Sequence, residues 1–459
     1  MKKPVIVAIG ILAIAPLYCG AIWLSAALAQ QRANQLLQRV TEQSKDMLKV
    51  VSRKQQVHFF SASEDITFAI NNPAINLLLS GLQETGDLKI VIHNDVEFGP
   101  LPGFHGVGMA RIESSLVLTP EQRKKLIDAI GTDKPLQFFT TLGYFGNAHF
   151  DIVSTPFEFH PNNQEARGSW KGGNVRFDFS RNLDAASFTG SAPGLVVNGK
   201  NESVLHVDEI TLSGTLQRKF EVLFTGNETF GVSNISFADP SNSDSTFSAK
   251  NITYGIRSTA DDQFINFGVI ADSGAVVYKN TNLKEGHFDF ATNHLDAKAV
   301  ASMYKTFQEL QTKRLNQSQN GAVDNSAVDS EDIKNKSAKD LLAILQHSPV
   351  LALDNIGFST PDGALKITGN ATINDVIETD ITPELQYQSL AKKIHAQADI
   401  GIDQSLIDHW PMPDNAAQLK QQVSALESQG LLIRRGNKLE SHIEYKDGKI
   451  TANGKQVGG

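Results

Sequence analysis

The sequence predicts a mainly β protein with a few helices (an α+β fold), in which a long, curved antiparallel β-meander follows an N-terminal transmembrane helix. Between about 135 and 295, apolar and polar residues alternate, as in Val175-Arg176-Phe177-Asp178-Phe179. This alternation is typical of strands with one packed face and one wet face. Turn signals such as Asn198-Gly199 separate the runs. Helical patterns between them are rare, so we expect antiparallel pairing rather than parallel crossovers.

Residues 1–30 are predicted to form the transmembrane anchor. The stretch from Pro4 to Ala29 is uncharged, and it is long enough to cross a hydrocarbon core of roughly 30 Å. Lys2 and Lys3 precede it. The positive-inside rule therefore predicts a single span with the N-terminus inside and the bulk of the chain outside.

Two other interpretations of residues 1–30 remain open. Ala27-Leu28-Ala29 resembles the small-residue site of a cleaved signal sequence, although the apolar run is longer than a typical signal core. Cys19 could carry a lipid, but Tyr18 before it is bulky where a lipidation signal has a small residue. Cys19 is the single cysteine, so an intramolecular disulfide is impossible.

Residues 31–56 are predicted to form a juxtamembrane amphipathic helix. Ala33, Leu36, Leu37 and Val40 follow helical spacing. The other face is basic, and it would either contact anionic headgroups or be a solvated face of a packed helix. The basic residues are Arg32, Arg39, Lys45, Lys49, Arg53 and Lys54.

The remaining chain is predicted to have three parts. Residues 57–315 form an antiparallel β-rich domain with short helices, 316–336 form a polar linker, and 337–459 form C-terminal β-hairpins with helices. The capping box that begins at Thr119 predicts one short helix, which Gly131 ends. Asp362-Gly363 and Asp447-Gly448 each lie between apolar runs and predict hairpins. Further helices are expected over 297–315, after Ser337 and from Asp414 to Gly430.

Composition excludes several classes of protein. The chain has 459 residues, of which 41% are hydrophobic and 20% charged, so it is neither disordered nor a multi-span membrane protein. Its net charge of −8 offers no basic field for nucleic acid.

Motifs for chemistry are absent from the sequence. It contains no His-Glu-x-x-His, Cys-x-x-Cys or Gly-x-Ser-x-Gly. His287 and His294 lie seven residues apart near two aspartates, but this spacing suits surface positions better than a metal site. We therefore predict no catalytic residue, no cofactor and no metal, and we favour a non-enzymatic role, with a hydrolase of unrecognised site as a remaining alternative.

Three segments resemble a known family. They are the N-terminal Met1-Lys2-Lys3 with its apolar span, the run Phe98-Gly99-Pro100-Leu101-Pro102, and a C-terminal Tyr-x-x-Gly-x-Ile-x-x-Asn-Gly pattern from Tyr445 to Gly454. In this order they resemble the YdgA-like family of bacterial envelope proteins, whose domain has no known function. The resemblance implies an inner-membrane protein whose bulk lies in the periplasm, and it implies no reaction.

Phenylalanines that alternate with polar residues define a candidate hydrophobic-ligand face. On a closed sandwich they would form the core, whereas on an open, curved sheet they would line a groove for lipid or another hydrophobic ligand. The alternative is a protein-interaction or scaffold module that docks other envelope proteins through helices within 297–346 and 414–429. The candidate residues are Phe157, Phe159, Phe177, Phe179, Phe288 and Phe290.

Overall fold

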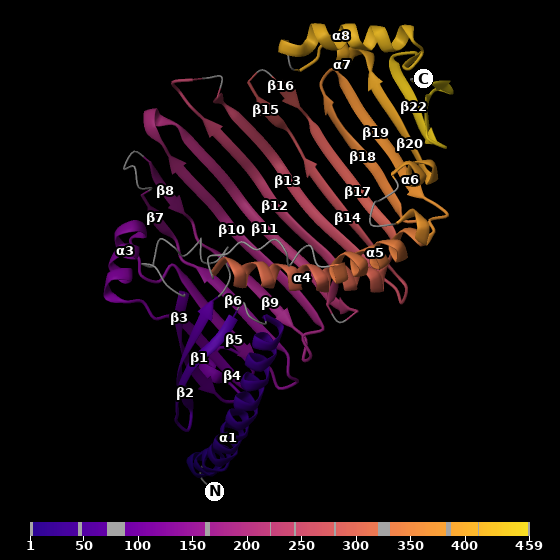
Figure 1. Ribbon diagram of the computed structural model, residues 1–459. Helices are drawn as coiled ribbons and strands as arrows, with labels where there is room; N and C mark the ends of the chain where they lie inside the picture. Colours follow the sequence, from indigo (N-terminus) through magenta and orange to yellow (C-terminus); the bar gives the residue numbers. More distant parts are fainter. Residues whose placement is uncertain are drawn as a thin grey trace. The chain divides into compact units, whose positions relative to one another are not determined.

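The computed structural model describes residues 3–44, 48–70, 88–160, 166–220, 222–242, 245–279, 281–319, 331–381, 387–411 and 413–457. It has two compact units. Unit 1 comprises Met1–Gln164, Ser169–Ala192 and Thr312–Val323, and unit 2 comprises Glu165–Gly168, Pro193–Gln311 and Asp324–Gly459. Both are built mainly from strands (Figure 1), and the strand pairings described below are all antiparallel, as the alternation in the sequence predicts.

Unit 1 is a meander that begins after one long helix. The ladder runs from β1 through β2, β3, β4, β5 and β6 to β9. Strands β8 (Arg167–Trp170) and β10 (Ala185–Asn198) each belong partly to unit 1 and partly to unit 2. The other elements are α1 (Lys3–Ser44), β1 (Leu48–Val57), β2 (Ser61–Ile70), β3 (Leu88–Phe98), β4 (Ala110–Leu116), α3 (Pro120–Ile130), β5 (Leu136–Leu142), β6 (Ala148–Ser154), β7 (Phe157–Phe159) and β9 (Gly173–Phe179).

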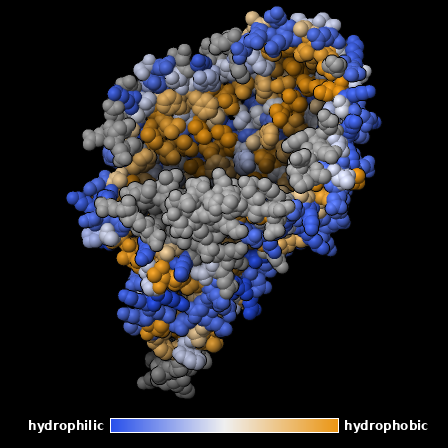
Figure 2. All heavy atoms as spheres, in the orientation of Figure 1, coloured by the Kyte–Doolittle hydropathy of each residue, from blue (hydrophilic) through white to orange (hydrophobic). Residues whose placement is uncertain are grey.

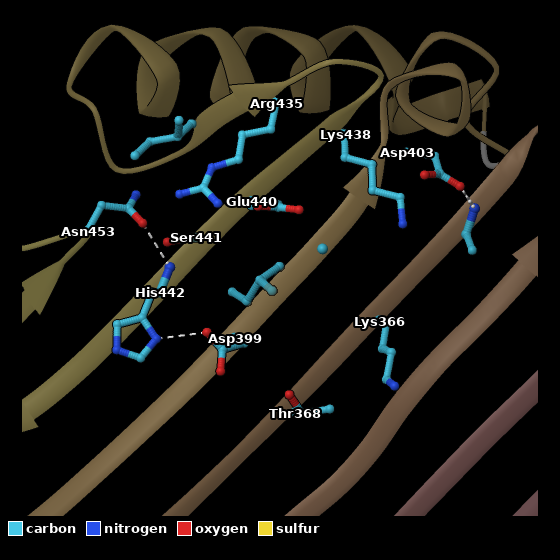
Figure 3. Close-up of a pocket in the computed structure, with 14 residues that line it drawn as sticks. Lys366, Thr368, Asp399, Asp403, Arg435, Lys438, Glu440, Ser441, His442 and Asn453 are labelled. Carbon is cyan, nitrogen blue, oxygen red and sulfur yellow. Dashed lines mark hydrogen bonds and ion pairs between the residues drawn. The ribbon is translucent and has the colours of Figure 1, made fainter.

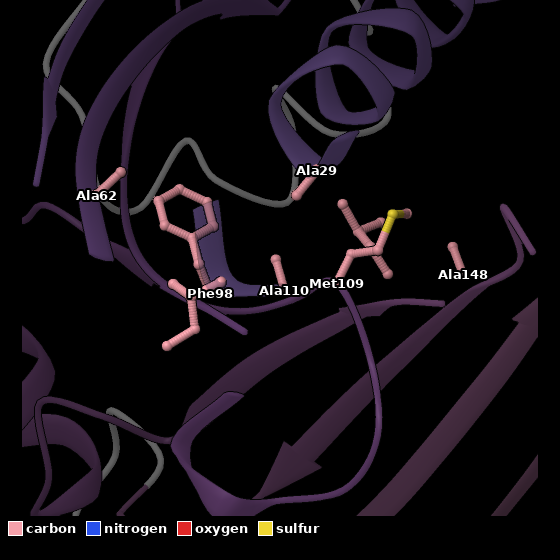
Figure 4. Packing of buried hydrophobic residues seen from close by; sticks show 8 residues of the cluster. Ala29, Ala62, Phe98, Met109, Ala110 and Ala148 are labelled. Carbon is pink, nitrogen blue, oxygen red and sulfur yellow. The ribbon is translucent and has the colours of Figure 1, made fainter. Parts of the chain in front are cut away.

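The second half of α1 packs on the sheet of unit 1. Ile22 and Ala29 are buried with Phe98, Met109 and other residues of the strands. In Figure 4, Ala29 lies on the helix above Phe98, Ala110 and Met109. Small residues at this contact let the helix approach the sheet closely, so α1 is part of the unit 1 core. Among the described residues, no helix combines the length and the apolar composition that crossing a membrane requires.

The helix predicted over 31–56 is wrong in its second part. Helix α1 ends at Ser44 and strand β1 begins at Leu48. The pair Val50-Val51 is β-branched and favours a strand. The guanidinium of Arg53 then pairs with the Glu64 carboxylate across β1 and β2. Lys49, Arg53 and Lys54 therefore lie on a strand and not on a basic helix face.

The short helix predicted after Thr119 is confirmed as α3. The backbone N–H of Gln122 donates to Thr119 Oγ1 at 3.2 Å, and the Thr119 N–H donates to Gln122 Oε1 at 3.0 Å. Gly131 ends the helix in the left-handed region, with φ of 72°. Local sequence signals of this kind need no tertiary contact.

Unit 2 is a longer meander with helices near the ends of its strands. Its ladder runs β11, β12, β13, β14, β17, β18, β19, β20, β22, β23 and β24. Its strands are β11 (Val204–Lys219), β12 (Leu223–Ala238), β13 (Phe247–Ala260), β14 (Phe264–Ser273), β15 (Val276–Tyr278), β16 (Thr281–Leu283), β17 (Glu285–Asp296), β18 (Val350–Thr360), β19 (Gly363–Ile373), β20 (Ile394–Asp403), β21 (Ile433–Arg435), β22 (Lys438–Lys446), β23 (Lys449–Ala452) and β24 (Lys455–Gln456). Its helices are α4 (Ala297–Gln319, in unit 2 as far as Gln311), α5 (Glu331–Gln346), α6 (Tyr387–Lys393), α7 (Gln404–Asp408) and α8 (Pro413–Ser428).

Two separate hydrophobic clusters pack α4, α7 and α8 against the strands. Ala297 and Ala301 of α4 pack with Leu223 and Ile265 of the strands. Ile407 of α7 and Val423 of α8 pack with Leu439 and other residues at the C-terminal end of the ladder. In Figure 1, α4 and α5 cross one end of the unit 2 strands, while α7 and α8 lie at the other end. The middle of the strands lies between the two clusters.

The predicted linker over 316–336 differs from the structure at both ends. Helix α4 continues to Gln319 and α5 already begins at Glu331, because Gln, Glu and Lys are good helix formers. Residues 320–330 lie outside the described part. The segment 337–459 is also not a separate domain. Its first strand, β18, pairs with β17 and continues the ladder that begins before α4.

Both predicted hairpins are confirmed. Asp362-Gly363 lies where β18 turns into β19. Asp447 and Gly448 have φ of 52° and 76° between β22 and β23, the left-handed pair that a type I′ turn requires.

Candidate hydrophobic ligand site

One face of the unit 2 sheet carries an unbroken apolar row. Residues directly opposite each other on paired strands share a face. Starting at β11 and ending at β20, the register places apolar residues opposite each other on every strand of the ladder. They are Leu212, Phe230, Tyr254, Ala271, Phe288, Ile356, Ile367 and Ile400, which we call the apolar row.

A polar row runs beside it on the opposite face. Its first eight members are next in sequence to residues of the apolar row, and Glu440 of β22 extends it by one strand. The members are Thr211, Gly231, Thr253, Asp272, His287, Gly357, Lys366, Gly401 and Glu440. The Asp272 carboxylate accepts a hydrogen bond from Thr253 Oγ1 at 3.5 Å and lies against His287 Nδ1. Along these two rows, from β11 to β20, one face of the sheet is apolar and the other is largely polar.

The middle of the apolar row is open to solvent. Phe230 is 42% exposed, Tyr254 43% and Phe288 37%. Figure 2 shows hydrophobic side chains gathered in a hollow over the middle strands of unit 2. An antiparallel sheet normally packs its apolar face on a core, so a continuous exposed apolar surface indicates a binding site.

Neighbouring positions widen this surface. Ile256, Val269 and Phe290 are opposite one another in the next row on the same face, which ends on β12 at the charged Glu228. On α4, Met303, Tyr304 and Phe307 are exposed rather than packed in the cluster that seats the helix. Thioether and aromatic side chains adapt readily to ligands of variable shape.

The six phenylalanines predicted from the sequence fall in different environments. Phe288 and Phe290 lie on the apolar face of unit 2. In unit 1, the ring of Phe177 lies 6.3 Å from Phe150 and 5.9 Å from Phe188 between centroids, and Phe179 packs against the cluster that holds α1.

Phe157 and Phe159 form a third group. They lie on β7 with ring centroids 6.2 Å apart, and β7 contacts α3. In unit 1, Phe179 packs against the α1 cluster and Phe157 and Phe159 lie on a strand beside α3, whereas in unit 2 Phe288 is exposed and Phe290 half-buried.

Sequence reasoning missed most of the apolar row. Phe230 and Tyr254 alternate with polar neighbours, which was the available signal. The alignment of separate strands into one row depends on cross-strand register, which the alternation of a single strand does not specify.

The opposite face of unit 2 has a polar pocket of about 420 Å³. Figure 3 shows side chains from β19, β20 and β22 around it, with Asn453 and Arg435 at its side. Lys366, Arg435 and Lys438 bring positive charge, while Asp399, Asp403 and Glu440 bring negative charge. This balance favours neither anions nor cations.

The pocket does not assemble a hydrolytic triad. His442 Nδ1 lies 2.7 Å from Asp399 Oδ1, and the His442 backbone N–H donates to Asn453 Oδ1 at 2.9 Å. Ser441 precedes His442 on β22, and successive side chains of a strand point to opposite faces. Ser441 is also buried. Elsewhere in the described part of the chain, His, Cys, Asp and Glu form no cluster that could hold a metal ion.

Comparison with protein families gives one result. A family model described as "Bacterial protein of unknown function (DUF945)" matches residues 1–458. The chain belongs to this family. Membership in DUF945 is consistent with the YdgA-like resemblance of its terminal segments, and it assigns no ligand, reaction or location. No curated protein and no solved structure matches the chain.

Proposed function

We propose that this DUF945 protein is a membrane-anchored, periplasm-facing envelope protein that holds lipid acyl chains, or a similarly elongated hydrophobic ligand, on the apolar face of unit 2. The observation that carries the proposal is the apolar row, with Phe230, Tyr254 and Phe288 exposed at its centre. The role is binding rather than catalysis.

The dimensions of the row suit acyl chains. Seven steps between adjacent strands of about 4.8 Å each give a length of roughly 34 Å from β11 to β20. A bilayer hydrocarbon core is roughly 30 Å thick and contains two layers of acyl chains. The row is therefore long enough for one extended chain or for two placed end to end.

Ligand binding would remove the free-energy cost of exposing the apolar row to water. Covering apolar surface stabilises by about 25 cal/mol per Å², and Phe230, Tyr254 and Phe288 are large side chains with much surface left to cover. The polar row on the other face keeps the sheet soluble without contacting such a ligand. Affinity would then depend on apolar area, with little selectivity for a headgroup.

The packing of α1 supports a retained anchor over a cleaved signal sequence. Cleavage after Ala29 would remove Ile22, Ser25 and Ala29, all of which are buried in unit 1. The uncharged residues from Pro4 to Ala21 would remain as the membrane segment, about 27 Å long at 1.5 Å per residue. With Lys2 and Lys3 before it, this segment favours a single inner-membrane span with both units in the periplasm.

The alternative of a scaffold module has less support. Val300 of α4, and Leu419 and Val423 of α8, belong to the apolar stripes expected to dock a partner, and they contact the clusters that seat these helices. Those three residues are used within unit 2, whereas Met303, Tyr304 and Phe307 of α4 and Leu426 of α8 remain exposed.

Native mass spectrometry of the full chain tests the proposal. The protein would be purified from a bacterial envelope, exchanged into a volatile buffer with a mild detergent, and then released from detergent in the instrument. We expect a bound hydrophobic molecule at a defined stoichiometry. A chain that carries none, and takes up none from added phospholipid, would contradict the proposal.

A further inference from the structure

Exposed aromatic and aliphatic residues gather at one end of the unit 1 sheet. Phe104 is 86% exposed and Phe145 90%, and Trp23 on α1 is 66% exposed. Such large apolar groups rarely stand free in water without a partner. With their exposed neighbours we call them the rim patch: Trp23, Leu24, Phe59, Phe60, Leu101, Phe104, Val107 and Phe145.

Hydrogen bonds tie the segments of the rim patch together. The β1–β2 turn, the β3–β4 connection and the β5–β6 connection lie at the same end of the antiparallel ladder. The Phe98 N–H donates to the Phe60 carbonyl at 2.9 Å, and Tyr144 Oη donates to the Gly99 carbonyl at 3.2 Å. Ser25 Oγ of α1 lies 2.7 Å from the same Tyr144 hydroxyl. The rim patch is thus one surface, and α1 is part of it.

The connections are shaped to hold apolar side chains outward. In the β3–β4 connection, Gly103 and Gly106 have φ of 55° and 121°, values that favour glycine. Between Gly99 and Met109, and between Gly143 and Asn147, the sequence has no Asp, Glu, Lys or Arg. Both connections therefore contain no charged residue of their own that would resist leaving water, although the Glu97 carboxylate of β3 lies beside Gly103.

We infer that the rim patch inserts into the surface of a phospholipid bilayer. The argument for a bilayer is continuity with α1, whose backbone runs without a break from Lys3 past Trp23. After Lys3, the first charged residue along this helix is Arg32. A membrane that contains the preceding uncharged residues would meet unit 1 at Trp23 and the rim patch, where aromatic side chains favour the interface. This inference rests on the membrane anchor of the proposed function, and it does not depend on a ligand in unit 2.

Depth-sensitive labelling of the full-length protein tests the inference. Cys19→Ala removes the native cysteine, and Phe104→Cys, Phe145→Cys and Val117→Cys each supply one site for the fluorophore NBD. Val117 is an exposed matched control, because it follows β4 at the end opposite the β3–β4 connection. Each labelled protein would be reconstituted into phosphatidylethanolamine–phosphatidylglycerol vesicles, with or without nitroxide on the acyl chains.

The labels at 104 and 145 should show a blue-shifted emission and lose intensity in the nitroxide vesicles, whereas the label at 117 should do neither. Equal behaviour of all three labels would overturn the inference. A blue shift at 104 and 145 without nitroxide quenching would overturn it too, because it would mean that a second copy of the chain covers the patch.

Discussion

Phe230 on β12 and Tyr254 on β13 lie directly opposite each other, and both keep more than a third of their surface in solvent. A cross-strand aromatic pair contributes only about 0.2–1 kcal/mol to the free energy of folding. The two side chains also belong to the apolar row, as Phe288 does. Their placement therefore favours contact with a ligand more than it increases the free energy of unfolding.

Phe230→Glu should abolish capture of a hydrophobic ligand and leave the fold intact. The glutamate would place a charge within the apolar row, where an acyl chain cannot solvate it. Because Phe230 is 42% exposed, the substitution buries no charge in the ligand-free protein. The measurement is the amount of lipid bound per chain, with circular dichroism to check the fold.

Thr229→Glu is the matched control for that variant. Thr229 is the neighbouring residue on β12, is exposed, and faces the other side of the sheet. It introduces the same charge and should leave lipid capture unchanged. Equal loss of capture in both variants would point to a general effect of charge rather than to the apolar face.

Phe177→Ala and Phe288→Ala should differ in their cost to stability. Phe177 is half-buried and packs between Phe150 and Phe188 in unit 1, so its truncation should lower the free energy of unfolding by about 2 kcal/mol. Phe288 is partly solvated, and its truncation should cost about 1 kcal/mol or less. Urea unfolding of the two variants gives both values, and a larger cost for Phe288 would mean that its face is a closed core.

The difference between these two residues shows where sequence reasoning reaches its limit. Both alternate with polar residues, so both were correctly predicted to lie on the apolar side of a strand. Whether that side is covered depends on elements distant in sequence, such as α1 against Phe179. The capping box at Thr119 and the turn at Asp447-Gly448 were predicted well because their signals are local. The helical spacing before Ser44 does not predict strand β1. From Leu48 onward, pairing with β2 determines the structure instead.

Ala29→Leu should destabilise unit 1 by overpacking. Ala29 is buried against the cluster that includes Phe98 and Met109 (Figure 4). Extra methylenes in a packed contact cost typically about 1–3 kcal/mol. Thermal unfolding should therefore shift to lower temperature. Ala27→Leu, at an exposed position on the same helix, should have little effect, and equal shifts would contradict the docking of α1.

Acid should weaken the connection between β19 and α6 through Asp380. The Ile377 backbone N–H, Lys393 and Ser389 hold the pKa of this carboxyl at about 2 in the folded chain. The pKa of an unfolded Asp is about 3.9. The stabilisation is therefore complete above the unfolded value and is lost as pH falls through about 2.

Asp380→Asn tests the direction of this pH dependence of stability. The variant should be less stable than the parent at neutral pH, and the difference should shrink as the pH falls below about 4. Asp375→Asn removes an exposed carboxyl nearby and is the matched control. A constant difference between parent and Asp380→Asn at every pH would show that the carboxylate charge is not what stabilises this connection.

The most direct test of the central claim is residue-level photo-crosslinking with a lipid that carries a photoreactive group on its acyl chain. The lipid would be incorporated into bacteria that produce the full chain, activated by light, and mapped by mass spectrometry. The account predicts crosslinks at residues of the apolar row, Phe230, Tyr254 and Phe288 above all, and none at Thr253 or His287 on the polar face. Crosslinks confined to α1 and the rim patch, with the apolar row unlabelled, would contradict it.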